Sequence, residues 1–185
     1  GHREQHRGRR MARAGQASGQ QREIARDVVG KESAERKEGD RVDRAGLLHE
    51  LRVTGCEAEY YHHDVTNEED WQSVVAKVRA RFGRLDVLVN NAGIGLSSAV
   101  VDMSFADWKR QVAVNLDGVF LGVKHSLPLM REGGGGSIIN VSSIAGIKAS
   151  PNVSGYCATK GGVRLFTKSV ALECAAAKDG VRVNS

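Results

Sequence analysis

Three residues in the last third of the chain carry the groups needed for proton transfer at an alcohol or a ketone. Tyr156 and Lys160 are four residues apart in a segment with helical periodicity, which puts the phenol and the ammonium on one helix face. Ser143 follows residues 138–141, whose sequence Ile-Ile-Asn-Val predicts a buried strand. A free tyrosine has a pKa of about 10, so a tyrosine base needs positive charge nearby. Lys160 can supply that charge, and the Ser143 hydroxyl can hold the substrate oxygen.

The spacing Tyr-x-x-x-Lys alone is common, because many amphipathic helices carry a half-buried tyrosine beside a solvated lysine. The interpretation therefore depends on the residues that accompany the pair. Asp64, Asn90 to Gly93 and Ser143 each follow a predicted strand, and Asn115 lies in a long predicted helix. The carboxyl ends of parallel strands meet at one edge of a sheet, where such sheets bind ligands. We expect these residues to converge at that edge.

Strands and helices alternate along the chain after residue 57. The predicted strands are Glu59–His63, Leu85–Val89, Ile138–Val141 and Val181–Asn184. The predicted helices run from a capping box of Thr66 and Glu69 to Gly83, from Ser104 to the Gly133–Gly136 loop, and from about Ser154 to Gly180. This order predicts an α/β fold with a doubly wound parallel sheet.

The residues before about Thr54 differ from the rest of the chain. They show neither an apolar stripe at helical spacing nor period-two alternation. We therefore expect residues 1–54 to be irregular or disordered, and residues 55–185 to form one domain. Most of the formal charge of +5 lies in the first segment. Its arginines have no interleaved aromatic side chains and no binding motif, so we expect no nucleic acid partner.

Composition also indicates where in the cell the protein works and which partners it lacks. No apolar run reaches the roughly 18 residues that a membrane span needs. The three cysteines are spaced neither as a metal-binding pair nor as a disulfide framework. His49, His62 and His63 have no third ligand at a suitable spacing, so we expect no metal. We expect a cytoplasmic protein with no membrane partner.

The order of the motifs resembles that of classical short-chain dehydrogenases, over residues from about 56 to 185. The matching motifs are Asp64-Val65, Asn90-Asn91-Ala92-Gly93, Asn115, Asn140-Val141-Ser142-Ser143, Tyr156-x-x-x-Lys160 and Arg182-Val183-Asn184-Ser185. The interval from Ser143 to Tyr156 matches that of the family, which selects Ser143 over Ser142 as the catalytic serine. The segment Ser154-Gly155-Tyr156 is further similar to bacterial hydroxysteroid and cyclic-alcohol dehydrogenases.

The resemblance implies a Rossmann-like fold and an NAD(P)-dependent oxidoreductase. The implied reaction interconverts a secondary alcohol, of the steroid or cyclic-alcohol type, and a ketone by hydride transfer. The implied catalytic residues are Asn115, Ser143, Tyr156 and Lys160. The implied cofactor-binding residues are Asp64, Val65, Asn91, Ala92, Gly93, Tyr156 and Lys160.

The resemblance also bears on the cofactor and on assembly. It implies NAD or NADP, with NAD favoured by the subfamily. The expected partners are a small alcohol or ketone and a second copy of the chain. A homodimer or homotetramer would form through the helices at about 104–131 and 155–178.

The likeness is incomplete at both ends. The family's glycine-rich first strand–turn–helix unit, which binds pyrophosphate, is not recognisable before residue 55, and its last strand is not found by Ser185. A reading frame shifted by one nucleotide over residues 1–10 would permit a Thr-Gly-x-x-x-Gly-x-Gly turn. We therefore expect a frameshifted N-terminal segment and a truncated C-terminus. The alternative function is an impaired fragment that acts at most as an interaction module.

Overall fold

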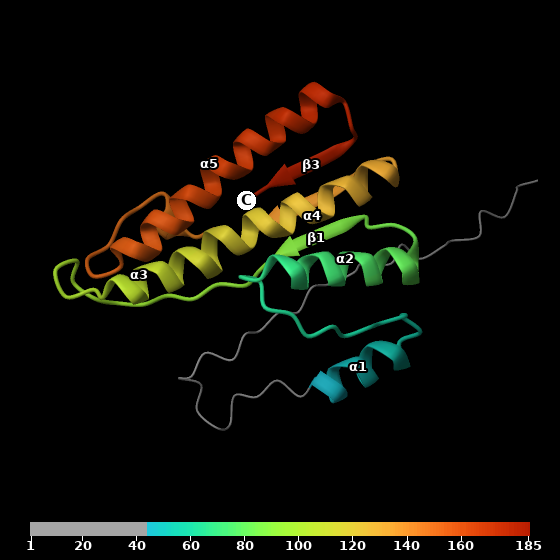
Figure 1. Ribbon diagram of the computed structural model, residues 1–185, viewed down its shortest axis with the longest axis horizontal. Coiled ribbons are helices and arrows are strands. Elements are labelled where there is room, and N and C mark those ends of the chain that lie inside the picture. The colour runs from blue at the N-terminus through green and yellow to red at the C-terminus, as the bar shows by residue number, and fades with distance from the viewer. Residues whose placement is uncertain (1–43) are drawn as a thin grey trace, which may run out of the picture.

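A computed structural model describes residues 44–185, and its centre is a small parallel sheet (Figure 1). The sheet consists of β1 (Val87–Asn90), β2 (Gly136–Asn140) and β3 (Val181–Asn184), in the order β1-β2-β3. Leu88 pairs with Ile138, and Ile138 pairs with Val183. Parallel neighbours need crossover connections, which helices provide here. Three of the predicted strands are thereby confirmed, with shifts of one or two residues at their ends.

The predicted strand at Glu59–His63 is wrong for the described structure. Residues 56–64 have no regular secondary structure. A strand exists only through hydrogen bonds to a neighbour, and no strand within residues 44–185 pairs with this segment. Alternation in the sequence indicates an extended chain, but it does not supply the partner.

The helices cover one face of the sheet. They are α2 (Glu68–Phe82), α4 (Gly118–Glu132) and α5 (Ser154–Ala177). Leu88, Ile138 and Val183 on the covered face are buried, whereas Ile139 on the opposite face is 42% exposed. A doubly wound sheet has helices on both faces, and residues 44–185 supply them for one.

Helix α2 begins after Asn67 rather than at the predicted capping box of Thr66 and Glu69. The Asn67 side chain accepts hydrogen bonds from the backbone N–H groups of Glu69 (2.8 Å) and Asp70 (3.3 Å). The Thr66 hydroxyl instead donates to the carboxylate of Asp64 (2.8 Å). Threonine and asparagine are both good N-caps, so their adjacency in the sequence left the choice open.

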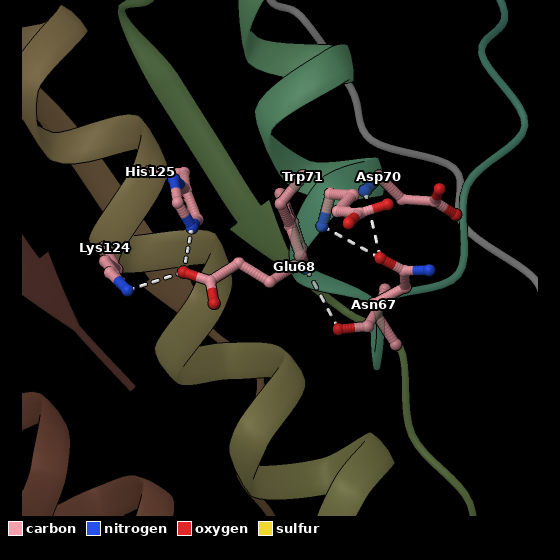
Figure 2. Close-up of polar contacts among 8 residues, drawn as sticks. Asn67, Glu68, Asp70, Trp71, Lys124 and His125 are labelled. Atoms are coloured by element: carbon pink, nitrogen blue, oxygen red, sulfur yellow. Dashed lines mark hydrogen bonds and ion pairs between the residues drawn. The ribbon is translucent and has the colours of Figure 1, made fainter.

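An exposed cluster ties the start of α2 to α4 (Figure 2). The Glu68 carboxylate accepts hydrogen bonds from the Lys124 ammonium and, at 2.9 Å, from the His125 ring. The bond from Lys124 does most to hold the pKa of Glu68 below its ordinary value. Because Glu68 and Lys124 are about half exposed, their ion pair contributes little to the free energy of unfolding.

Helix α3 (Phe105–Val112) and α4 form one long rod that lies beside α5 (Figure 1). The rod contains a π-helical turn at Ala113–Asp117. Ser104, where the sequence predicts that this helix starts, caps it by accepting a hydrogen bond from the Asp107 N–H (3.0 Å). Phe105, the first residue of α3, is 70% exposed.

Helix α5 matches the predicted range closely, except at its end. It stops at Ala177, where Lys178 takes a left-handed conformation with φ of 53°. Gly180, the predicted stop, has φ of 74° and instead forms the turn into β3. In the described part of the chain, no helix combines the length and apolarity that crossing a membrane requires.

Helix α1 (Arg44–Val53) lies in the segment expected to be irregular or disordered, so that prediction is wrong for these residues. Leu48, Glu50 and Leu51 are strong helix formers, and they suffice for a short helix without a long apolar stripe. Figure 1 shows α1 on the far side of α2 from the sheet. The rest of the prediction for residues 1–54, with the expected frameshift, falls on 1–43, outside the described residues.

Helix α4 approaches β1 closely because it carries glycine at the contact. A Cβ on Gly122 would overlap the Oδ1 atom of Asn90 and lie 2.9 Å from Cη2 of Trp71. Asn90 cannot yield easily, because its Nδ2 donates to Oδ1 of Asn140 in the buried core (2.8 Å). The spacing between helix and strand is thus set by a residue without a side chain.

Gly122→Ala is expected to lower the free energy of unfolding by about 2 kcal/mol, since overpacking a rigid contact is destabilising. Urea unfolding followed by circular dichroism measures the change. The matched control is Gly161→Ala on α5, where the nearest atom to the new Cβ is 3.9 Å away. Equal unfolding free energies for the two variants would contradict the proposed contact.

Candidate active site

Lys160 lies at the centre of the candidate site, on the buried side of α5. The residue is 3% exposed, and its Nζ donates a hydrogen bond to the backbone oxygen of Val141, just after β2 (2.7 Å). Burial lowers the pKa of Lys160, because the charged form loses solvation. Nζ is 5.8 Å from the centre of the Tyr156 ring, so the predicted pair is adjacent.

The loop that follows β1 passes over the tyrosine–lysine pair. A Cβ added to Gly95 would lie 3.7 Å from Cδ2 of Tyr156. A Cβ added to Gly93 would lie 3.4 Å from both Nζ of Lys160 and Oδ1 of Asn115. Glycine at these two positions keeps the space above the pair clear of side chains.

Asn115 joins this loop to α5. The π turn contains Asn115, which is 0% exposed. Its Oδ1 accepts a hydrogen bond from the Ile94 N–H (2.8 Å), and its Nδ2 donates to the Ile94 oxygen (2.8 Å) and to Oγ1 of Thr159 (3.1 Å). The Thr159 hydroxyl donates to the backbone oxygen of Tyr156 (2.9 Å). One side chain therefore contacts both walls of the site.

Ser143 follows the end of β2 and directly precedes a short 3-10 turn, Ile144–Gly146. Its Oγ accepts a hydrogen bond from the Ala145 N–H (3.1 Å). The neighbouring Ser142 donates its hydroxyl to the backbone oxygen of Lys160 (2.9 Å), which ties the loop to α5. The two serines thus differ, because the Ser142 proton is used within the fold and the Ser143 oxygen acts as an acceptor.

The predicted cofactor-binding residues fall into two groups. Val65, Asn91 and Ala92 line one pocket near the end of β1, together with Trp71 and Val119. Gly93 lies beyond that pocket, next to Lys160. The structure therefore places Val65 beside residues that follow β1, although no strand precedes Val65 within residues 44–185.

Asp64 does not line this pocket. Its carboxylate accepts hydrogen bonds from the N–H (3.0 Å) and the hydroxyl (2.8 Å) of Thr66. The side chain therefore shapes the turn that leads to α2. In the part of the chain that the structure describes, no three His, Cys, Asp or Glu side chains are grouped to hold a metal ion.

Sequence reasoning missed Gln111, a second buried amide on the same rod as Asn115. Gln111 is 0% exposed, and its Oε1 accepts a hydrogen bond from the Leu96 N–H (3.2 Å). The signal that could have found it is its spacing, four residues before Asn115 and therefore on the same side of the helix.

A sequence model of the family described as short chain dehydrogenase matches residues 14–185. The chain belongs to the short-chain dehydrogenases. The match to the family begins well upstream of the boundary near residue 54 that the composition indicates.

Two similar proteins are dehydrogenases by name, which agrees with the family match. A 3-alpha-(or 20-beta)-hydroxysteroid dehydrogenase of Mycobacterium tuberculosis is 44% identical over 147 residues, which cover 80% of this chain and 55% of the relative. A cyclopentanol dehydrogenase of Comamonas testosteroni is 44% identical over 136 residues, which cover 74% of this chain and 54% of the relative. The chain spans about half the length of the curated relatives it matches.

Solved structures give the fold. A gluconate 5-dehydrogenase from Burkholderia cenocepacia, in complex with NADP and tartrate, superposes with a TM-score of 0.70 at 35% identity, covering 76% of this chain and 54% of the other. ElxO with NADP bound superposes with a TM-score of 0.65 at 37% identity, covering 68% and 50%. The described sheet and helices are thus part of the Rossmann-like fold of the family.

The burial of Lys160 predicts a stability that rises with pH on the alkaline side. The folded state disfavours the ammonium, so the pKa of Lys160 is lower in the folded chain than in the unfolded one. Between those two pKa values the unfolded state holds the additional proton, and the free energy of unfolding therefore increases with pH.

Urea unfolding at several pH values, up to the ordinary lysine pKa, measures this dependence. Lys160→Met should lack the part of the increase that the buried ammonium causes. Lys168→Met, at an exposed position of the same helix, is the control and should keep it. The inference about Lys160 fails if both variants follow the pH dependence of the parent chain.

Proposed function

We propose that this chain carries the catalytic centre of an NAD(P)-dependent oxidoreductase that interconverts a secondary alcohol and a ketone. The observation that carries the proposal is the buried Lys160 ammonium, held by Val141 beside the ring of Tyr156. A buried charge without a carboxylate partner is costly, and such groups are concentrated at functional sites. The relatives that act on hydroxysteroids and cyclopentanol support the same reaction class.

Tyr156 would act as the acid and base. In the oxidative direction its phenolate would take the proton of the substrate hydroxyl, and in the reductive direction the phenol would return it. Lys160 would favour the phenolate through its positive charge. The Ser143 oxygen already accepts a bond from Ala145, which directs the hydroxyl proton toward a substrate oxygen rather than into the turn.

Asn115 would belong to the proton path behind Lys160, as the family resemblance implies. Its amide oxygen and the Lys160 Nζ flank the same backbone position, Gly93, each 3.4 Å from where a Cβ would be. Its other bonds, to Ile94 and Thr159, keep the amide fixed. Both polar atoms thus border the space that Gly93 leaves open, and the proposed path would run along it.

The described residues fit a dinucleotide at two places. Val65, Asn91 and Ala92 lie together near the end of β1, where the resemblance implies the adenosine end, and Gly93 leaves room for a ribose whose hydroxyls Lys160 could reach. When bound, a nicotinamide would supply the acceptor or donor of the hydride. Two solved relatives are bound with NADP, and the subfamily resemblance favours NAD, so the proposal covers both.

Apolar side chains beside Ser143 support a bulky ring as the substrate. Ile144 and Ile147 follow Ser143 closely in the chain and are 75% and 71% exposed. Isoleucines left open next to a catalytic serine favour steroid or cyclic alcohols over small polar ones.

We also propose that two copies of the chain associate through the helices at about 104–131 and 155–178. Large apolar side chains on these helices support this, since Phe120, Leu165 and Leu172 are 46%, 71% and 72% exposed. Light scattering after size exclusion tests it, and a monomer at micromolar concentration would contradict it.

The alternative is a fragment without turnover that acts at most as an interaction module. One observation favours it. The glycine-rich turn that usually binds a pyrophosphate is not recognisable in the sequence before residue 55.

Tyr156→Phe is expected to lower the turnover of cyclopentanol or of a 3-alpha-hydroxysteroid about 100-fold or more, because the phenyl ring cannot exchange a proton. Initial rates with NAD and with NADP measure this. Tyr61→Phe is the control and should keep the parental rate. Tyr61 lies in the loop before α2, and its ring lies near the ammonium of Lys77 on that helix. Parental turnover in Tyr156→Phe would refute the mechanism. A parent chain that neither turns over nor binds either cofactor on titration would favour the alternative.

A further inference from the structure

Gln111 and Asn115 together hold the loop that follows β1. Both side chains are completely buried, one helical turn apart on the α3–α4 rod. Asn115 bonds to both backbone polar groups of Ile94, and Oε1 of Gln111 accepts from the N–H of Leu96 (3.2 Å). The loop is therefore fixed at two residues that are separated by one position.

The residue between these two anchors is the one that faces the tyrosine. A Cβ on Gly95 would lie 3.7 Å from Cδ2 and 3.8 Å from Cε2 of Tyr156. The backbone of the loop thus forms a wall against the ring. Asn115 fixes the wall on one side of Gly95, and Gln111 fixes it on the other.

The other end of the Gln111 amide is held by packing. A Cβ on Gly155 would lie 2.8 Å from Nε2 of Gln111 and 3.3 Å from Sδ of Met103. Glycine directly before Tyr156 therefore leaves the space that the amide occupies. An alanine there would push Nε2 away and disturb the bond to Leu96.

The Gln111 amide is not optimal for stability. Within residues 44–185, no acceptor lies within hydrogen-bond distance of its buried Nε2. A buried donor without a partner is destabilising, so an apolar side chain of the same size would serve a purely structural role better. The bond to Leu96 is the feature that only the amide provides.

We propose that Gln111 is a positioning residue of the active site. Wedged between Gly155 and Leu96, it sets how closely the 94–96 loop packs on Tyr156 and so where the phenol stands. The inference rests on the proposed function, in which Tyr156 exchanges the proton. A displacement of a reacting group by a fraction of an ångström is enough to lower a catalytic rate strongly.

Two variants of the full chain break this arrangement in different ways. Gln111→Met keeps the volume and removes the acceptor for Leu96. Gly155→Ala keeps Gln111 and displaces its amide, and it should not unfold the chain because alanine favours helix. The matched controls are Gln72→Met, exposed on α2, and Gly161→Ala on α5, where the added Cβ would make only an ordinary contact at 3.9 Å.

Amide hydrogen exchange, resolved by residue, reads the loop directly. We expect the Leu96 amide to exchange about tenfold faster in both variants, with the unfolding midpoint unchanged or raised and the controls like the parent. With cyclopentanol as substrate, kcat should fall about tenfold, while the KM of the cofactor changes less than about twofold. The double variant should be no worse than either single variant, because both disturb one contact.

Parental exchange at Leu96, or parental kcat in a folded Gln111→Met chain, overturns the proposal. A loss of stability with parental kcat also overturns it, since that is the result of a merely structural role. If Gln111→Met does not fold, Gly155→Ala decides by the same two measurements. If the parent oxidises neither cyclopentanol nor a hydroxysteroid, the proposed function fails, and exchange at Leu96 alone then decides whether Gln111 holds the loop.

Discussion

The geometry of the site depends on the carboxamide of Asn115. Its oxygen accepts one hydrogen bond and its nitrogen donates two, so a buried amide is satisfied by the loop after β1 and by α5 at once. Polar groups buried in this way are strongly directional, because any displacement leaves one of them without a partner. The loop, which carries Gly93 and Gly95, and helix α5, which carries Tyr156, are therefore held in one relative position.

The core beneath the site is held by the same kind of interaction. Asn90 donates to Asn140, and Asn140 donates to Thr167 on α5 (3.0 Å), so that β1, β2 and α5 are linked through buried side chains. An apolar core could be equally stable, but it would fix the positions of β1, β2 and α5 along their axes less strictly. Precision at the strand ends is what a site assembled from three separate segments requires.

Much of this arrangement could be predicted from the sequence, for reasons that particular residues make clear. Tyr156 and Lys160 share a helix face because of their spacing, and the strand before Asn90 is marked by its nearly continuous aliphatic run. The extended segment 59–63 could not be assigned a partner, because pairing is a property of the whole sheet. Thr66 and Asn67 are both common caps, and the bond from Thr66 to Asp64 leaves Asn67 to cap the helix.

Two further features could not be read from local patterns. Val112, Leu116 and Val119 keep helical spacing across the π turn at Ala113–Asp117, so periodicity does not reveal it. Glutamines inside helices are usually solvated. Gln111 is buried instead because it accepts a hydrogen bond from Leu96, in the loop after β1. Both depend on contacts between segments far apart in the chain. The roles of the site residues remain predictions, while their proximity is a property of the fold.

The wide turn in the rod also affects how the rod can change in length. Each residue of an α-helix turns the chain by about 100°, so a residue lost from regular helix rotates one end of the rod against the other by about that angle. The π turn at Ala113–Asp117 holds about one residue more than a regular turn. A single deletion inside it would restore regular helix and leave Gln111 and α4 close to their present relative orientation. A residue lost from this turn therefore disturbs the rod less than a residue lost from α3 or α4.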